Sequence, residues 1–257
     1  AQGYGRVDAE IRDTAGIDGA YAYVYGYYDG TDVVAVKTGY AEGDYADAKA
    51  PVFTKILIKY EYDSNGVLTT KSTYYYDSSL VESVTNAAAD VYGGVYYHYM
   101  NEDFNAQGYG RVDRMVLGAA DGVGAIAYYY EYYTGTTVIS KKIGYANADY
   151  SDPANPLLTV PVVSYEYDTN GDLTTIYTYY ASGRMQSKTT NTPDAQGNVY
   201  FHFIDEAFYD NGTPADLTDD YGRMDRNVMN AADGVGAIAY YYEYHSGTDV
   251  VSKQIGY

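Results

Sequence analysis

Three histidines are the side chains of this sequence best suited to acid–base or metal chemistry. His98 and His202 occupy matching places in the strings "YYHYM" and "YFHFI", and His245 follows another tyrosine run. A metal or catalytic site would need partner ligands, but the chain has no Cys and no H-x-x-x-H spacing. We therefore expect these histidines to replace tyrosine on strands, and we expect no enzyme activity.

Acidic side chains offer the next candidate chemistry, which is cation binding. Asp168, Asn170 and Asp172 in "DTNGD" resemble a fragment of a calcium loop, although a full loop needs more oxygens and a distant Glu. Asp210 and Asp216 belong to a second acidic stretch, 210–220. Plain turn chemistry is the preferred interpretation of "DTNGD". Ca²⁺ is the one ion that these oxygens suggest, and otherwise we expect no cofactor.

Other catalytic motifs are missing from the sequence. The glycines of "DGVGA" at 121–125 and 233–237 lack the Lys and Ser/Thr of a phosphate-binding loop. No G-x-S-x-G nucleophile motif occurs. Acidic pairs are frequent, but 35 Asp and Glu residues produce such pairs by chance. Nothing marks two of them as a glycosidase couple.

The composition favours strands that carry tyrosine. The chain of 257 residues has 38 Tyr, 5 Phe and no Trp, and its formal net charge is −19. Tyrosine suits a half-wet β surface, where its hydroxyl finds a partner. The negative charge excludes the basic footprint of a nucleic-acid-binding protein. No apolar run is long enough for a membrane-spanning helix, so we expect no membrane insertion.

Internal repeats organise the chain. "AADGVGAIAYYYEYYTGTTVISKKIGY" at 119–145 recurs at 231–257 with 5 differences in 27 positions. "YGR" recurs from Tyr4, Tyr109 and Tyr221, at intervals of 105 and 112 residues. We divide the chain into copy 1 (1–105), copy 2 (106–217, with a loop insertion near 209–220) and a partial copy 3 (218–257). Because the chain starts and stops inside a copy, we expect a segment of a longer array.

Shorter units inside each copy have the pattern of a β-hairpin. Each consists of Tyr-x-Tyr, a glycine turn and a return strand rich in Val, Thr, Ser and Lys. We expect the turn at Asn65–Gly66, like that at Asn170–Gly171, to be a two-residue hairpin turn with positive φ at both positions. Stretch 77–91 is the single predicted helix. The structural turn positions are Gly66, Gly171, Gly135 and Gly247.

The hairpin tips resemble a known repeat family. "YEYDSNGVL" at 60–68 and "YEYDTNGDL" at 165–173 are similar to the YD repeat, Y-x-Y-D-x-x-G-R-L, of Rhs proteins and teneurins. "YTYYASGRM" at 177–185 keeps the Gly-Arg-apolar half. No single unit holds the whole motif, and the similarity covers about a third of the chain. The resemblance implies β-hairpins that spiral into an extracellular shell or form cell-surface recognition modules.

Arginines and rows of tyrosines recur at equivalent positions of the repeat. We expect Arg6, Arg111 and Arg223 to be structural, each pairing with an acidic side chain or stacking on a tyrosine ring. Exposed tyrosine rows could contact glycans or a partner protein. The candidate rows are Tyr128, Tyr130, Tyr240 and Tyr242.

The fold expected from these patterns is all-β: tandem antiparallel β-hairpin repeats in an elongated array that could form filaments. The function expected is structural and adhesive, as a segment of an extracellular or cell-surface fibre. Its partners would be further repeats or identical subunits, because unprotected strand edges pair with more strands. Two alternatives stay open: a surface module that binds carbohydrate or protein, and part of a YD-repeat shell that encloses a toxin.

Overall fold

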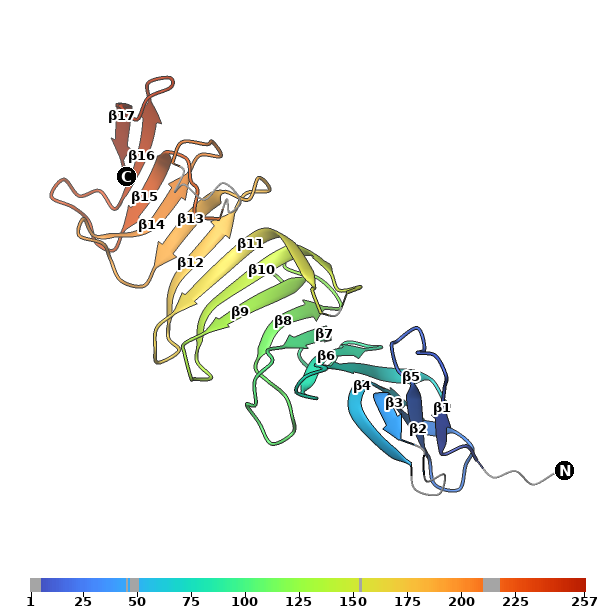
Figure 1. The fold of residues 1–257 in the computed structure, drawn as a ribbon. Coiled ribbons are helices and arrows are strands. Elements are labelled where there is room, and N and C mark those ends of the chain that lie inside the picture. The colour runs from blue at the N-terminus through green and yellow to red at the C-terminus, as the bar shows by residue number, and fades with distance from the viewer. Residues whose placement is uncertain (1–5, 45, 47–50, 153, 210–217) are drawn as a thin grey trace. The chain divides into compact units, whose positions relative to one another are not determined.

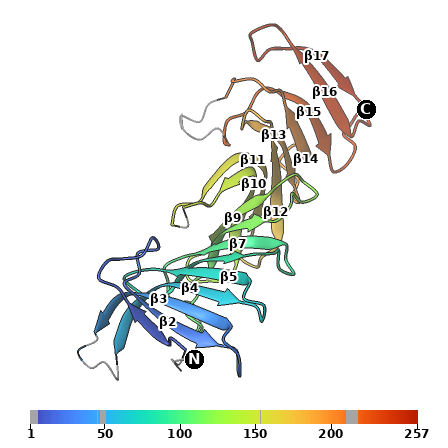
Figure 2. The same ribbon diagram turned by 90° about the vertical axis from the view of Figure 1, so that its right-hand side faces the viewer.

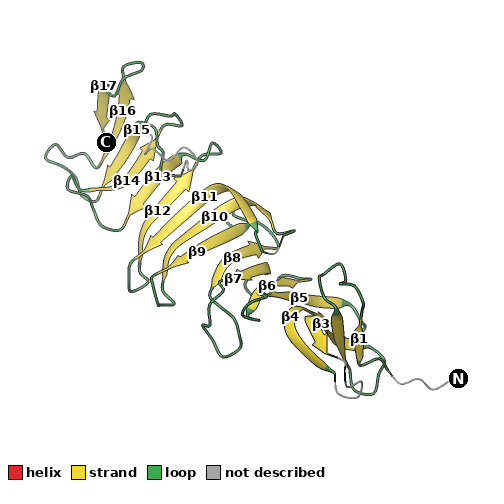
Figure 3. Ribbon diagram, in the orientation of Figure 1, coloured by secondary structure: helices red, strands yellow, loops and turns green. Residues whose placement is uncertain are grey.

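The computed structural model describes residues 6–44, 46, 51–152, 154–209 and 218–257. These residues form seventeen β-strands and no helix (Figures 1 and 3). The prediction of an all-β chain of antiparallel hairpins in series is therefore confirmed. In keeping with this, the described part of the chain holds no helix of the length and apolarity that crossing a membrane requires.

The first of two compact units comprises Ala1–Ala119 together with Asp149–Leu157. Each of its strands pairs antiparallel with the next strand along the chain (Figure 2). The strands are β1 (Ala9–Ile11), β2 (Ala22–Tyr27), β3 (Val34–Asp44), β4 (Val52–Tyr62), β5 (Leu68–Tyr74), β6 (Val81–Asn86), β7 (Gly94–Tyr99) and β8 (Val112–Leu117).

The second unit comprises Ala120–Ala148 and Leu158–Tyr257. β9 pairs antiparallel with β10, β10 lies beside β11, and each strand from β11 to β17 pairs antiparallel with the next. The strands are β9 (Ala127–Tyr132), β10 (Ile139–Asp149), β11 (Leu157–Tyr167), β12 (Leu173–Tyr179), β13 (Met185–Thr190), β14 (Asn198–Phe203), β15 (Met224–Met229), β16 (Ala239–Tyr244) and β17 (Val251–Gly256).

The prediction of a helix over 77–91 is wrong. Its centre is β6, which pairs with β5 on one side and β7 on the other. Val81 and Ser83 are buried while Glu82 is half-buried, which is the alternation of a strand. β-Branched Val81, Val84 and Thr85 fit a pleated surface better than a helix, and ladder pairing on both sides decides the outcome.

The hairpin turns differ from the predicted two-residue type. Gly66 N–H donates to Asp63 O at 2.9 Å, so the loop has three residues, and only Gly66 has positive φ (79°). This is a type I turn followed by a left-handed glycine. Asp63 Oδ1 selects it by accepting the backbone N–H groups of Asn65 (2.8 Å) and Val67 (2.9 Å).

The same D-x-x-G turn recurs along the chain. Asp168 accepts two backbone N–H groups in the same way, and Gly171 has φ of 88°. Gly135 and Gly247 also have positive φ, 71° and 70°. The further carboxylates that accept two backbone N–H groups of their own turn are Asp90, Asp121, Asp194 and Asp233.

A tyrosine lying over a cross-strand glycine forms the centre of each unit. Tyr128 on β9 pairs with Gly144 on β10. A Cβ at Gly144 would lie 3.0 Å from the Tyr128 ring and 2.9 Å from Val163. The ring therefore occupies the space that any larger residue would need. The same cross-strand pairs are Tyr23–Gly39 and Tyr240–Gly256.

The phenol of each central tyrosine reaches a turn aspartate. Tyr128 OH donates to Asp121 Oδ2, and Tyr240 OH to Asp233 Oδ2. Lys142 Nζ lies 3.7 Å from the centre of the Tyr128 ring. Small and β-branched residues complete both cores: Ala20, Ala22 and Ile58 in the first unit, and Ala125, Ala127 and Val163 in the second. The core is thus small and contains satisfied polar groups.

Replacing the central glycine should destabilise the second unit. In Gly144→Ala, the added Cβ must displace the Tyr128 ring, Ala125 or Val163, so we expect a loss of about 1–3 kcal/mol in the free energy of unfolding. Urea denaturation followed by circular dichroism measures it. Gly122→Ala is the matched control, because nothing lies within 4 Å of its Cβ position. Equal effects of the two changes would refute the packing role.

The turn aspartates predict acid sensitivity. The Val67 N–H, together with that of Asn65, lowers the pKa of the Asp63 carboxyl, and the Asp172 and Asn170 N–H groups do the same for Asp168. A lowered folded-state pKa gives stability that is present above the unfolded pKa, about 4, and lost as pH falls through the folded pKa. We expect the urea concentration at the midpoint of unfolding to be constant from pH 7 to about pH 5 and to decrease when the pH is lowered below about 4.

A double variant tests whether these two turn aspartates cause the loss of stability at low pH. Asn105 already occupies the aspartate position of one turn and accepts N–H from Gln107 and Tyr109. Asp63→Asn with Asp168→Asn should therefore fold and show a flatter fall in stability below pH 4. An unchanged pH profile would assign the acid sensitivity to other carboxylates.

Candidate functional site

His98 on β7 and His202 on β14 each contact an aspartate. His98 Nδ1 lies 2.5 Å from Asp113 Oδ1, and His202 Nδ1 lies 2.5 Å from Asp225 Oδ1. These aspartates were not found from the sequence, although both follow "YGR" at the same spacing. A tyrosine ring packs edge-on against each imidazole, with centroids 6.3 Å apart; the rings are those of Tyr75 and Tyr180.

Burial limits what the His–Asp pairs can do. A carboxylate that orients an imidazole is the arrangement of a general base. However, the His98 residue is 5% exposed, and the neighbouring Tyr75 hydroxyl donates to the carbonyl oxygen of Tyr99 at 2.6 Å. The second imidazole nitrogen, Nε2, lies 3.5 Å from the Tyr75 hydroxyl in His98 and 3.5 Å from the Tyr180 hydroxyl in His202. We interpret both pairs as cross-strand structural contacts.

The "DTNGD" oxygens are engaged by their own turn. Asp168 Oδ1 accepts the N–H groups of Asn170 (2.8 Å) and Asp172 (3.0 Å), and Asn170 Nδ2 approaches Asp168 Oδ2 at 3.3 Å. Across the described ranges, no group of three or more His, Asp or Glu side chains is arranged to hold a metal ion. Asp210 and Asp216 lie outside the described residues. Calcium binding stays a prediction.

The predicted tyrosine rows differ in accessibility. Tyr128 is 4% exposed and Tyr130 is half-buried, with ring centroids 6.3 Å apart. Lys142 covers both rings, and burial lowers the pKa of its amine. Tyr240 and Tyr242 are half-buried and also lie 6.3 Å apart. Tyr128 is therefore packed within its unit, whereas Tyr130, Tyr240 and Tyr242 are each partly exposed.

Two of the recurring arginines form bidentate pairs with glutamate. Arg111 Nε and Nη2 donate to the carboxylate of Glu102 at 2.6 and 2.8 Å. Arg223 does the same with Glu206, also at 2.6 and 2.8 Å. Arg6 lies 5.0 Å from the centre of the Tyr27 ring. Each of the three arginines therefore has an acidic or aromatic contact in its own unit.

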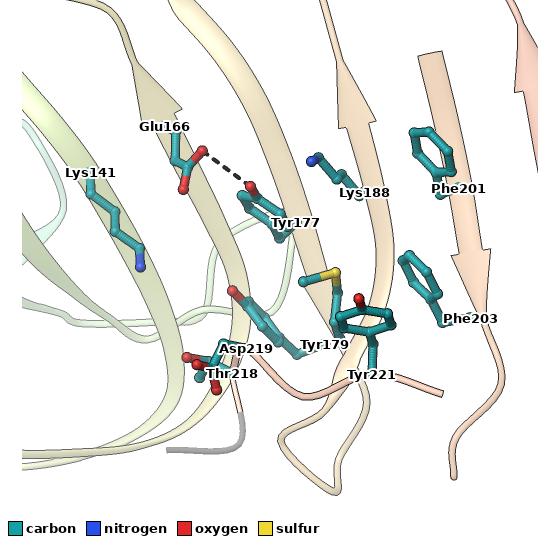
Figure 4. Close-up of a pocket in the computed structure, with 11 residues that line it drawn as sticks. Lys141, Glu166, Tyr177, Tyr179, Lys188, Phe201, Phe203, Thr218, Asp219 and Tyr221 are labelled. Atoms are coloured by element: carbon teal, nitrogen blue, oxygen red, sulfur yellow. Dashed lines mark hydrogen bonds between the residues drawn. The ribbon is translucent and has the colours of Figure 1, made fainter. Parts of the chain in front are cut away.

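An aromatic pocket in the second unit is the site that sequence reasoning missed. Figure 4 shows side chains from β10 to β14 and from the segment before β15 converging on it. Tyr177, Lys188 and Phe201 lie side by side on three neighbouring strands, in direct register. The cavity has a volume of about 580 Å³, within the range of small-molecule sites. Its further lining residues are Lys141, Glu166, Tyr179, Met185, Phe203, Thr218, Asp219 and Tyr221.

Polar groups of both signs line the pocket. Tyr177 OH donates to Glu166 Oε2 at 3.1 Å, and burial followed by the Glu166 charge raises the pKa of Tyr177 to about 12. Lys188 Nζ lies 5.8 Å from the centre of the Tyr177 ring. Phe203 packs against Tyr221 with centroids 5.0 Å apart. The arrangement offers aromatic faces, hydrogen-bond acceptors and ammonium donors around one cavity.

A comparison of the two copies could have revealed this pocket. Copy 2 carries larger or charged side chains at three positions where copy 1 has small or apolar ones. The changes from copy 1 to copy 2 are Val36 to Lys141, Ser72 to Tyr177 and Val84 to Lys188. These three differences belong to no motif and lie on three separate strands, β10, β12 and β13, so the sequence alone does not place them together.

Comparisons with known proteins give weak similarity. The sequence matches no protein-family model and no curated protein. One similar solved structure is the Photorhabdus luminescens Tc holotoxin pore, with 10% identity and a TM-score of 0.18. Another is the TcdB2–TccC3–Cdc42 complex, with 12% identity and a TM-score of 0.16. The matches cover 93% and 87% of this chain but only 15% and 12% of those chains.

The arginine–glutamate fork makes a testable contribution to the first unit. In Arg111→Lys, the single ammonium group cannot reproduce the two parallel hydrogen bonds to Glu102. The Arg111 side chain is only 12% exposed, so water cannot easily replace the lost bond. We expect about 1–2 kcal/mol of destabilisation. Urea denaturation measures it, and Arg184→Lys is the control because its contact with Asp205 is long, at 3.5 Å. Equal losses for both variants would contradict a special role of the fork.

Proposed function

We propose that the chain is a segment of a structural and adhesive β-hairpin array at the cell surface, in which copies join through stacked tyrosines. One observation carries this proposal. Tyr150, in the segment Asp149–Leu157 of the first unit, stacks on Tyr96 of β7 with centroids 5.0 Å apart and an interplanar angle of 28°. Tyr96 is completely buried. The segment belongs to copy 2 by sequence, yet it packs with the unit formed mainly by copy 1.

The second unit contains an equivalent position for such a stack. Tyr200 on β14 has the same register as Tyr96, with threonine on the preceding strand and valine on the following one. Tyr200 is half-buried, and no ring of the described residues stacks on it. The corresponding segment of another copy would complete the pattern. A stacked pair adds about 0.5–1.5 kcal/mol beyond the area that it buries.

The chemistry of the side chains supports a structural role over a catalytic one. His98 and His202 are engaged with aspartates, and the turn carboxylates accept their own backbone N–H groups. Repeated units that satisfy their polar groups locally can be added one after another. The high negative charge would limit unspecific lateral association between such arrays.

Self-association tests the proposal. Tyr200→Ala should remove the acceptor ring and shift concentration-dependent sedimentation of the chain toward the monomer, by at least about tenfold in the association constant. Tyr92→Ala is the control, because Tyr92 is 80% exposed. A peptide spanning residues 145–159 should compete with association, and the same peptide with Tyr150→Ala should not.

Electron microscopy of the native assembly separates the array from its alternatives. Filaments with a regular axial repeat would support the array. Hollow particles would favour the shell that the YD-like tips suggest. A strictly monomeric wild-type chain, unaffected by Tyr200→Ala, would overturn the stacking proposal.

A further inference from the structure

The pocket of the second unit has a local charge pattern unlike that of the whole chain. The formal net charge is −19, whereas the cavity is lined by two ammonium groups, those of Lys141 and Lys188, and by two carboxylates, those of Glu166 and Asp219. Neither amine forms an ion pair with a carboxylate of the described residues, and the same is true of Lys37, Lys71 and Lys142. Elsewhere Lys55, Lys59 and Lys253 are paired with glutamate. The two pocket amines can therefore contact an external anion without breaking an existing ion pair.

The aromatic part of the pocket is arranged as a platform. Tyr177 and Phe201 flank Lys188 in one cross-strand row, and Tyr179, Phe203 and Tyr221 line the same cavity (Figure 4). Aromatic faces bind apolar C–H surfaces, and polar groups between them orient the ligand. Glu166, whose carboxylate already accepts the Tyr177 hydroxyl, adds an acceptor for ligand hydroxyl groups.

The fold does not require this combination of side chains. At the same positions copy 1 has Val36, Ser72 and Val84, and its pairs β2–β3, β4–β5 and β5–β6 keep the register of β9–β10, β11–β12 and β12–β13. It therefore lacks both amines and one ring of the platform. Since copy 1 forms its strands without them, the fold does not depend on them, although the partial copy 3 keeps the first amine as Lys253. This difference within one chain is the argument for a ligand.

We propose that the pocket lined by Lys141, Tyr177, Lys188 and Phe201 binds an acidic oligosaccharide whose sugar rings carry carboxylate groups. The sugar C–H face packs on Tyr177 and Phe201. The ring carboxylates lie against the two lysines, because a charge-assisted contact is stronger than a neutral one. The sugar hydroxyls donate to Glu166. A highly phosphorylated ligand fits less well, because each phosphate carries more negative charge than a carboxylate and is repelled more strongly by Glu166 and Asp219, which also line the cavity. This function is additional to the array and does not depend on it.

Titration calorimetry on the full chain tests the proposal with defined probes. Trigalacturonic acid should bind with a dissociation constant of about 1 mM or tighter, and binding should weaken as salt is raised. Maltotriose, a neutral trisaccharide, should bind at least about tenfold more weakly. Equal affinity for the two sugars would overturn the role of charge. Absence of heat from both sugars at several millimolar would overturn the site.

Variants taken from the sister copy make the test specific to the pocket. Lys141→Val with Lys188→Val should weaken trigalacturonate binding at least tenfold, and Tyr177→Ser should weaken both sugars. Each introduces the residue that copy 1 already carries, so folding is expected to persist and is checked by circular dichroism. Lys253→Val is the control, because Lys253 lies outside the pocket with its side chain 55% exposed. If Lys253→Val weakened binding as much as the pocket variants, binding would be unspecific and the proposal wrong.

Discussion

The cross-strand pair of tyrosine and glycine is the contact on which the rest of each unit depends. The ring of Tyr128 fills the space above Gly144, and its phenol reaches the carboxylate of Asp121 in the preceding turn. One side chain thus joins a strand, its neighbour and a turn. Tyr23 and Gly39 make the same pair in the first unit. A leucine could fill the space but could not hold the turn.

Tyrosine as the main large residue changes how the interior is stabilised. Little apolar surface is fully buried, so hydrogen bonds to carboxylates and carbonyls matter more than in a dry core. Tyr28 OH, for example, reaches the carbonyl oxygen of Tyr62, and Tyr180 OH that of Phe203. Each of these bonds reaches across one intervening strand, from the end of β2 to β4 or from the end of β12 to β14, and is thus local to three consecutive strands. Locality lets the same unit be repeated without a central core that closes the fold.

Repetition also separates scaffold positions from positions that are available for binding. The turn aspartates, the His–Asp contacts and the arginine–glutamate forks recur in equivalent places. Among the pocket residues, Tyr177 and Lys188 are Ser72 and Val84 in copy 1, and Lys141 is Val36 there although it recurs as Lys253 in the partial copy 3. Recurrence therefore indicates what the strands need, and departure from it indicates chemistry added to one copy. The aromatic pocket is such a departure, whereas Tyr200 recurs at the place of Tyr96.

The sequence by itself determined the all-β class, the serial hairpins and the glycine turn positions. These follow from local patterns: Tyr-x-Tyr alternation, positive φ at glycine, and repeats of fixed length. The sequence-based prediction of a helix at 77–91 was wrong. A short stretch of sequence does not reveal that β6 will form hydrogen bonds with a strand on each side, β5 and β7. Only the tertiary structure joined His98 to Asp113 and brought Tyr177, Lys188 and Phe201 into one row. Those contacts depend on strand register, which alternating tyrosines on both faces leave undetermined until neighbouring strands pair.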